Sequence, residues 1–207
     1  MMKIVFLTTG LLRTNSYLIF KEGEKDAILI DAGGDVEKIM HVARENGVTI
    51  KHLLLTHGHF DHIGACAELK RQGAKIYIHE LDKRKVETDE SLCGFSGIKV
   101  EKFTPDVVLR GGEELLVSGF SVKVLHTPGH TSGSVCYVLS DVIFSGDTLF
   151  SQSFGRTDLG DGNIKLLSDS IINKLFTLDG NYTVYPGHDS ATDLDTERRL
   201  NPIFYYV

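Results

Sequence analysis

The sequence predicts an α+β domain in which β-sheets carry helices on their outer faces. Three observations support this class. Short apolar runs alternate with amphipathic stretches, several strand-like runs are joined in pairs by tight turns, and a composition of 42% hydrophobic and 24% charged residues is normal for a globular protein. A chain of 207 residues is long enough to bury a core of its own, so we expect a single domain over residues 1–207.

The first part of the chain contains strands and one clear helix. The strands are short apolar runs closed by Asn, Gly or Asp, at residues 3–8, 16–20 and 26–31. Residues 35–46 are predicted to form a helix, because their apolar side chains share one face, Asp35 is a plausible N-cap and Gly47 ends the segment. Residues 50–56 form the next predicted strand.

The middle of the chain continues this alternation. A second helix is expected over about residues 61–72, and residues 75–79 return as a strand. The stretch 80–104 gives no clear prediction. Residues 113–126 are predicted to form a hairpin, because two strand-like runs flank a Ser-Gly turn.

The last part of the chain supplies another strand pair, over 134–139 and 141–145, around a short turn. A helix is expected over 163–176 and a final strand over 182–185. Hairpins with interspersed helices indicate sheets that have helices outside them, in α+β or four-layer style.

Charge and cysteine usage restrict the classes of partner. The net charge is −6, from 22 Lys and Arg against 28 Asp and Glu, so we expect no nucleic-acid partner. No run approaches about 18 apolar residues and no signal-peptide pattern opens the chain, so we expect no membrane span and a cytoplasmic location. The odd number of well-separated cysteines predicts buried free thiols in a reducing compartment: Cys66, Cys93 and Cys136.

The strongest functional signal is the run THGHFDH at residues 56–62, which contains three imidazoles and a carboxylate. Both groups are common zinc ligands. His57 and His59 are two apart and point to one side of an extended chain, whereas Asp61 and His62 lie at the opening of the predicted helix. One pair can therefore serve one metal, and the next pair a neighbouring metal.

Three later residues also follow β-rich runs, each close to a glycine that lets the backbone turn sharply. They are His130, Asp147 and His188. Together with the first run they make seven candidate ligands, too many for one tetrahedral ion, so we expect about two metals.

In this order, the HxHxDH run and the later His, Asp and His resemble the metallo-β-lactamase superfamily. The resemblance extends from ILIDAGG at 28–34 to ERRLNP at 197–202. It implies a four-layer αβ/βα sandwich with the metals at one edge, between the two sheets. It also implies one metal held by His57, His59 and His130, and another held by Asp61, His62 and His188. Asp147 would bridge both metals, and Asp31 would support the metal loops without being a ligand.

The chemistry implied by this resemblance is hydrolysis with two Zn²⁺ ions. Their charge exceeds what Asp61, Asp147 and a bridging hydroxide remove, so the site favours a substrate that builds negative charge on oxygen. The expected mechanism is attack of the metal-bridging hydroxide on a carbonyl carbon, with Asp61 and Asp147 as catalytic residues. The substrate is expected to be a small molecule.

Within the superfamily, the segments GDTLFSQSFGRTDLGDGN and PGHDSATDLDTERRLNP look like the glyoxalase II-like group, which hydrolyses thioesters such as hydroxyacylglutathione. The chain ends soon after His188, so we expect no helical C-terminal glutathione-binding domain and only weak selection among thiol groups. Arg156 is expected at the rim of the site. Either its cation meets an anionic substrate group, or it forms a structural pair with Asp158.

Two other activities stay open. The persulfide dioxygenase branch shares the HxHxDH and GRTD segments, and implies a single iron held by His57, His130 and Asp147. A lactonase-type hydrolase of the same fold is the other. The zinc β-lactamases, the diiron flavoproteins and the RNA-processing branch match less well. The sequence gives no prediction of the oligomeric state.

Overall fold

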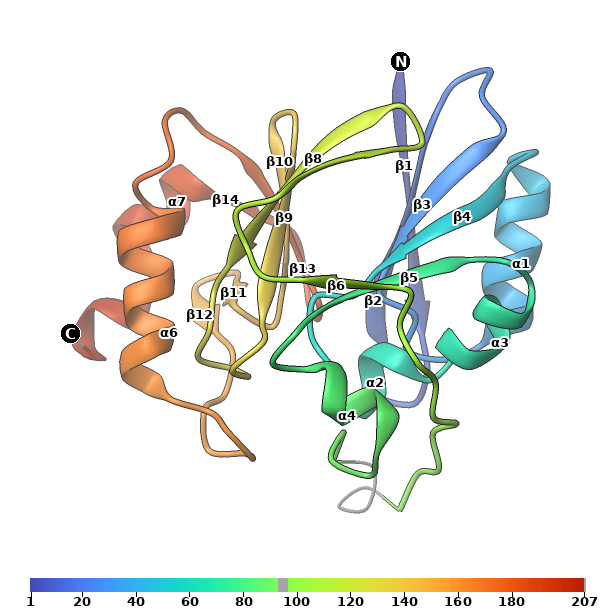
Figure 1. Ribbon diagram of the computed structural model, residues 1–207. Helices are drawn as coiled ribbons and strands as arrows, with labels where there is room; N and C mark the ends of the chain where they lie inside the picture. Colours follow the sequence, from blue (N-terminus) through green and yellow to red (C-terminus); the bar gives the residue numbers. More distant parts are fainter. Residues whose placement is uncertain (93–96, 207) are drawn as a thin grey trace.

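Two six-stranded sheets face each other in the computed structural model, which describes residues 1–92 and 97–206 (Figure 1). The first sheet contains the strands of the N-terminal half in the order of the chain. These are β1 (Met2–Thr9), β2 (Thr14–Lys21), β3 (Asp26–Ile30), β4 (Thr49–Leu54), β5 (Lys75–His79) and β6 (Val107–Leu109). The first three strands are antiparallel, and β3 to β6 run parallel.

The second sheet has the order β14-β13-β10-β9-β8-β7. Its strands are β7 (Glu114–Val117), β8 (Phe120–His126), β9 (Val135–Leu139), β10 (Val142–Gly146), β13 (Thr183–Pro186) and β14 (Thr192–Asp193). Strands β10 and β13 are parallel, so the residues that follow them leave the sheet at the same edge. A separate small hairpin joins β11 (Leu149–Phe150) to β12 (Ser153–Phe154).

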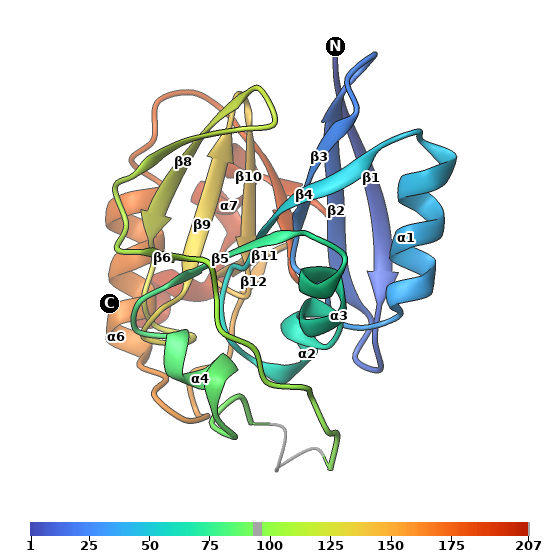
Figure 2. The ribbon, with the colours of Figure 1, turned by 45° about the vertical axis from the view of Figure 1, so that its right-hand side comes forward.

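Helices cover the outer faces of both sheets (Figures 1 and 2). The first half contains α1 (Val36–Glu45), α2 (Phe60–Ile63), α3 (Cys66–Arg71) and α4 (Lys83–Glu87). The second half contains α6 (Ile164–Ser170), the π-helical turn η1 (Ile171–Leu175), α7 (Leu194–Leu200) and the 3-10 turn η2 (Pro202–Tyr206). Helices α1 and α3 lie outside the first sheet, and α6 and α7 lie outside the second. The predicted four-layer αβ/βα sandwich is confirmed.

Alternating side chains of the strands build the layers. On β3, Ala27 and Leu29 pack into the cluster under α1 and α3, whereas Ile28 and Ile30 pack into the cluster between the sheets. Successive residues of a strand point to opposite faces, so a strand buried on both sides is apolar throughout. The third cluster joins the second sheet to its helices.

The helix predicted over about 61–72 is wrong as a single element. It is divided into α2 and α3, because the groups that would bond across the break have partners elsewhere. The amide of Ala65 donates to the carbonyl of Ala32 at 2.9 Å. The carbonyl of Asp61 accepts from Oγ1 of Thr14 at 2.8 Å. Two tertiary hydrogen bonds thus replace one helical bond.

Asp35 precedes α1, as predicted, but its side chain does not cap the helix. Its backbone is left-handed, with φ of 52°, and its carboxylate accepts from the amide of Gly10 at 2.9 Å. The carboxylate therefore ties the β1–β2 turn to the start of α1.

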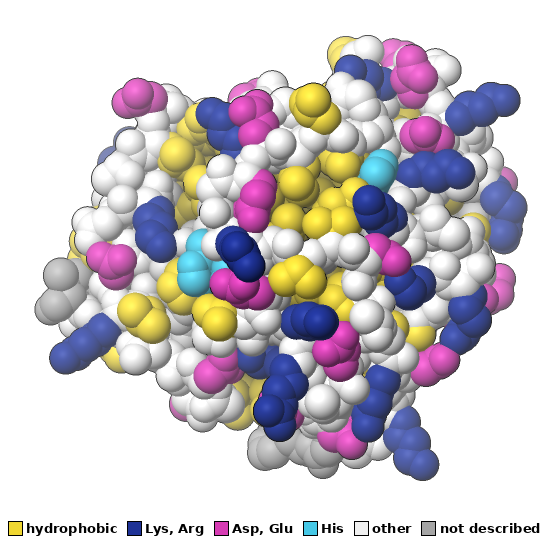
Figure 3. All heavy atoms as spheres, in the orientation of Figure 1, with side chains coloured by type: hydrophobic (Ala, Val, Ile, Leu, Met, Phe, Trp, Pro, Cys, Tyr) yellow, Lys and Arg dark blue, Asp and Glu magenta, His cyan; other side chains and the backbone are white. Residues whose placement is uncertain are grey.

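Several short elements were not predicted from the sequence, among them α4, β6 and the β11–β12 hairpin. Cys66 and Cys136 are buried free thiols, as predicted, and Cys93 lies outside the described residues. Among the described residues, no helix is long and apolar enough to cross a membrane. On the face in Figure 3, Lys and Arg side chains are interspersed with Asp and Glu.

Candidate metal centre

The seven candidate ligands come from four loops that follow strands. The loop after β4 carries His57 and His59 and leads into α2, which begins at Phe60 and so places Asp61 and His62 on its first turn. The other three follow β8, β10 and β13, and they are His130, Asp147 and His188. The first sheet therefore supplies four candidates and the second sheet three, and the fold brings all seven together.

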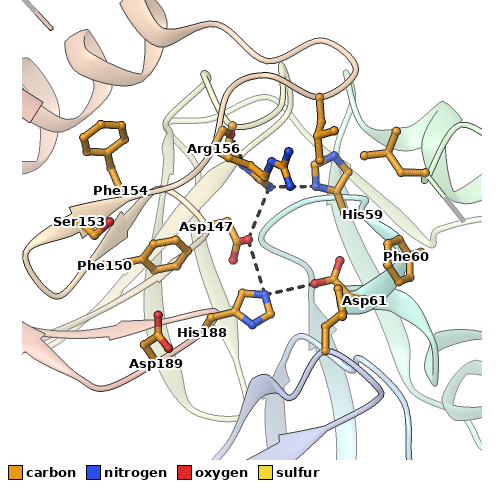
Figure 4. Close-up of a pocket in the computed structure, with 14 residues that line it drawn as sticks. His59, Phe60, Asp61, Asp147, Phe150, Ser153, Phe154, Arg156, His188 and Asp189 are labelled. Carbon is orange, nitrogen blue, oxygen red and sulfur yellow. Dashed lines mark hydrogen bonds and ion pairs between the residues drawn. The ribbon is translucent and has the colours of Figure 1, made fainter. Parts of the chain in front are cut away.

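The possible ligand atoms form three groups, and within each group all of these atoms lie within 4.8 Å of one another. They are His57–His59–His130, Asp61–His62–His188 and His57–His62–Asp147. The first two are the two sets that the sequence resemblance implies. Asp147 lies between them, because its Oδ2 is 3.6 Å from Nε2 of His130 and 3.7 Å from Nε2 of His188. Figure 4 shows Asp61, Asp147 and His188 pointing toward a common space.

The donor atoms fit metal ions. The Nε2 atoms of His57 and His62 and Oδ1 of Asp147 are buried, and no described residue gives them a hydrogen bond. Buried polar atoms without partners are rare and destabilising in folded proteins. Imidazole nitrogen and carboxylate oxygen are ordinary ligands of zinc and related divalent ions. A pair of bound cations would satisfy these atoms together.

Hydrogen bonds at Nδ1 orient two of these rings and turn their Nε2 atoms toward the centre, where Nε2 of His130 also lies 2.9 Å from Nδ1 of His59. Nδ1 of His62 donates to Oδ2 of Asp31 at 2.8 Å. Nδ1 of His130 donates to the backbone carbonyl of Arg156 at 2.8 Å. A proton held on Nδ1 in this way leaves the lone pair of Nε2 available for a metal. The predicted supporting role of Asp31 matches these contacts.

Asp31 also holds the loop after β4. Its Oδ1 accepts from the amide of Thr56 at 2.8 Å, and its Oδ2 accepts from Oγ1 of Thr56 at 2.7 Å. Asp31 is 1% exposed and has a left-handed φ of 53°. Strained backbone of this kind is concentrated at functional sites.

The electrostatics of the metal-free site favour ligands in their binding form. Burial, together with the neighbouring imidazoles, holds the pKa of His57 well below its ordinary value. Burial and the charge of His130 lower the pKa of His59 to about 4. Burial opposes ionisation of Asp147, but the facing imidazoles of His62 and His130 outweigh it and lower the pKa of that carboxyl. Neutral imidazoles and ionised carboxylates are the forms that bind metal.

His62 is the exception. Burial alone would lower the pKa of His62, but Asp147, Asp31 and Asp61 outweigh it and raise that pKa well above the ordinary value. A metal ion arriving at Nε2 would replace a proton attracted by the same carboxylates.

A pocket of about 580 Å³ opens over this cluster. His59, Asp61, His130, Asp147 and His188 line its inner part. Its walls include apolar side chains from α2, the β11–β12 hairpin and two loops: Leu12, Phe60, Phe150, Phe154 and Leu159. The aromatic residues of the β11–β12 hairpin were not singled out by the sequence, since nothing in their local pattern distinguishes a pocket wall from a buried core.

Arg156 lies at the pocket rim, where the sequence predicts it (Figure 4). Its Nε and Nη2 donate to the carboxylate of Asp158 at 2.7 and 2.8 Å. These bonds lower the pKa of Asp158 to about 2. The pair that the sequence offered as the structural alternative is therefore present, and Arg156 is also among the residues that line the pocket.

Glycines next to the ligands allow close packing. A Cβ on Gly187 would lie 2.3 Å from Oδ1 of Asp147 and 2.7 Å from Cε1 of His62. A side chain there would occupy the space where the candidate ligands meet, so the glycine before His188 is required by contact.

Comparison with known proteins agrees with this geometry. The chain is 38% identical to the probable metallo-hydrolase YqgX of Bacillus subtilis, over 95% of this chain and 94% of the relative. It is 37% identical to the hydroxyacylglutathione hydrolase GloC of Haemophilus influenzae, over 97% of each chain.

Solved structures of similar proteins have the same fold as this chain. The BLEG-1 B3 metallo-beta-lactamase superposes with a TM-score of 0.91 at 35% identity, covering 98% of both chains. TTHA1623, solved in a di-iron-bound form, superposes with a TM-score of 0.86 at 35% identity, covering 96% of this chain and 98% of that one. The sequence profile of the Metallo-beta-lactamase superfamily matches residues 9–188, a span that includes every candidate ligand. The chain belongs to the metallo-beta-lactamase superfamily.

Proposed function

We propose that this protein is a dinuclear zinc hydrolase that cleaves thioesters of the hydroxyacylglutathione type. The observation that carries the proposal is the pair of three-residue ligand sets with Asp147 between them, at the base of an open pocket. The similarity to a hydroxyacylglutathione hydrolase supports the thioester as the bond cleaved.

The seven candidate ligands would hold two metal ions. His57, His59 and His130 would hold one ion, and Asp61, His62 and His188 the other. Two divalent ions, when bound, supply Lewis-acid polarisation of a carbonyl and a water that loses its proton near neutral pH. Asp147 would contribute one carboxylate to both ions, and Asp61 a second negative charge to one of them.

Both sheets would act as one catalytic domain, because residues of both share the central cluster. Ile28 and Ile30 of the first sheet pack there with Val122 and Val124 of the second. The buried free thiols of Cys66 and Cys136 support the reducing cytoplasm as the place of action.

The pocket walls bear on substrate selection. They are largely apolar, and Arg156 already donates to Asp158. Recognition of a charged, flexible tripeptide requires polar partners that offset its ordering on binding. We therefore propose that the thiol half of the substrate is weakly selected and that the acyl carbonyl is the part held firmly.

Two observations favour alternatives to the proposed zinc thioesterase, one for its activity and one for its metal. The similarity to a B3 metallo-beta-lactamase makes β-lactam hydrolysis the second candidate function. The di-iron form of a similar protein makes iron the competing metal. If the protein binds iron, persulfide dioxygenase activity becomes a further candidate, with the iron held by His57, His130 and Asp147.

A single set of assays separates these activities. Freshly purified protein is analysed for zinc and iron, then given thioesters that share one acyl group and differ in thiol, a chromogenic β-lactam, a lactone, and glutathione persulfide with an oxygen electrode. We expect about two zinc ions per chain, thiol release from every thioester at similar kcat/KM, and no oxygen uptake.

Each contrary result has a definite meaning. One firmly bound iron with rapid oxygen uptake and inert thioesters would replace the hydrolase by a dioxygenase. A lactone or β-lactam cleaved in preference to every thioester would move the activity to that class. A glutathione preference of about a hundredfold, equal to about 2.7 kcal/mol, would contradict weak thiol selection.

A further inference from the structure

Asp82 is a buried carboxylate whose position the proposed chemistry does not explain. It follows β5 and precedes α4, yet its side chain does not cap that helix. Asp82 has no exposed surface. Isolated buried charges are strongly destabilising, so a carboxylate at such a position must be fully bonded.

The carboxylate of Asp82 joins the two loops that carry the three-histidine set. Its Oδ2 accepts from the amide of Gly58 at 2.7 Å and from Oγ1 of Thr131 at 2.8 Å. Its Oδ1 accepts from the amide of Gly133 at 3.1 Å. Gly58 lies between His57 and His59, and Thr131 directly follows His130. One side chain therefore fixes the spacing between segments more than 70 residues apart, which supply all three imidazoles of this set.

Glycines permit this approach. A Cβ on Gly133 would lie 2.6 Å from Oδ1 of Asp82, and a Cβ on Gly58 would lie 2.9 Å from Cβ of Lys85. Real Cβ atoms do not approach other atoms so closely, so both loops need glycine where they meet Asp82. Glycine at position 58 is therefore needed for two reasons, the tight turn of the motif and the close contact with Lys85.

A cation completes the junction. Nζ of Lys85 lies 2.8 Å from Oδ1 of Asp82 and 2.8 Å from Oδ2 of Asp161. Asp161 in turn accepts from the amide of Ser132 at 2.9 Å. Burial disfavours the charge on Lys85, but the two carboxylates outweigh it and raise its pKa. Each of the two carboxylate oxygens of Asp82 thus accepts from two donors, which makes the junction rigid.

We infer that Asp82 is a positioning residue that presets the His57–His59–His130 set for its metal. This inference rests on the proposed dinuclear centre. The opposite set, Asp61–His62–His188, makes no hydrogen bond to Asp82 within the described residues. Loss of the carboxylate should therefore weaken one metal site and leave the other nearly unchanged.

The test measures zinc affinity of metal-free protein by competition with a chromophoric chelator. Asp82→Asn keeps the shape of the side chain but replaces one acceptor oxygen by a donor group. Thr131→Val removes one of the four bonds to Asp82, together with the bond between the hydroxyls of Thr131 and Ser134, and serves as a milder variant if Asp82→Asn folds poorly. Asp106→Asn is the matched control, because Asp106 also accepts from a backbone amide, that of Ile76 at 2.9 Å, at the opposite end of β5.

Variants that retain only one of the two ligand sets show which metal site the change at Asp82 affects. In His188→Ala protein, which retains the three-histidine set, Asp82→Asn should weaken zinc binding at least about tenfold, the usual effect of losing a supporting partner. In His59→Ala protein, which retains the other set, the same change should have an effect below about threefold. Thr131→Val should show the same selectivity with a smaller loss, and Asp106→Asn should change neither affinity.

Three results would overturn the inference. Zinc affinity unchanged by Asp82→Asn in the His188→Ala background would show that the junction does not position the histidines. Equal losses in both backgrounds, in proportion to a lowered melting temperature, would make Asp82 a general stability residue. Wild-type protein that binds no metal would remove the proposed centre itself, a failure distinct from the other two because it precedes any comparison of variants.

Discussion

At the scale of single residues, contacts decide which of two chemical roles a side chain has. Asp31 and Asp147 are both buried acids near the same imidazoles. Asp31 has its oxygens occupied by donors from Thr56 and His62, so it orients a ligand. The Oδ1 of Asp147 is buried without a hydrogen bond to any described residue and lies 3.3 Å from Nε2 of His62, another candidate ligand, so Asp147 is the acid available to a metal.

Arg156 gives a prediction at this scale, because its partner can be removed without touching it. Asp158→Asn deletes the charge that holds the guanidinium. Solvent screens this exposed ion pair, so it is weak, and freeing Arg156 should lower KM for a thioester bearing a carboxylate by no more than about fivefold. A neutral thioester of the same size should be unaffected, and Arg156→Ala should raise KM for the anionic substrate alone.

Steady-state kinetics on this substrate pair check the expectation. KM values that stay the same for both substrates in both variants would leave Arg156 as the structural partner of Asp158. Its backbone carbonyl would still orient His130, since a side-chain substitution does not remove it.

At the scale of elements, the division between α2 and α3 shows tertiary bonds overriding local helical preference. The chain turns at Gly64, whose φ of −58° and ψ of −28° suit any residue. A Cβ there would nevertheless lie 2.3 Å from the carbonyl oxygen of Gly33. Glycine is needed at this position for contact and not for conformation.

Gly64→Ala is therefore expected to destabilise the protein, although alanine favours helices by about 1 kcal/mol over glycine. Forcing apart two packed backbone segments typically costs about 1–3 kcal/mol, which exceeds the gain in propensity. Urea unfolding of the metal-free variant and wild type measures the difference. A variant more stable than wild type would mean that the loop containing Gly33 moves aside freely.

At the scale of the whole molecule, the candidate metal centre lies where the two sheets meet, and each sheet supplies part of it. The loop after β4 carries His57, His59, Asp61 and His62, and the second sheet carries His130, Asp147 and His188. Bound ions would therefore link the two halves at the edge of the central cluster. Metal binding and the stability of the sandwich should be coupled.

Adding zinc to metal-free protein should raise its melting temperature. A ligand present at about 1,000 times its Kd adds about 4 kcal/mol to the free energy of unfolding. Differential scanning calorimetry with zinc and with a chelator gives the shift. Asp147→Ala should reduce the shift most among single-ligand variants, because Asp147 faces both sets. A melting temperature that zinc does not change would contradict a centre that joins the two sheets.

The sequence by itself determined the fold class and most strands of both sheets, and it predicted the set of candidate ligands, whereas β6 and β14 were found only in the structure. A short apolar run is a local property, and the run from His57 to His62 contains its chemistry within a few residues, so both can be recognised without a structure. Only the tertiary structure decided the break before Ala65, the role of Asp35, the pairing of Arg156 and the junction at Asp82. In each case the deciding partner is chosen by the packed fold, and for Ala65, Asp35 and Asp82 it lies more than 20 residues away along the chain. Hydrogen bonds between such distant groups leave no periodic pattern in the sequence, because packing of the whole chain brings the partners together.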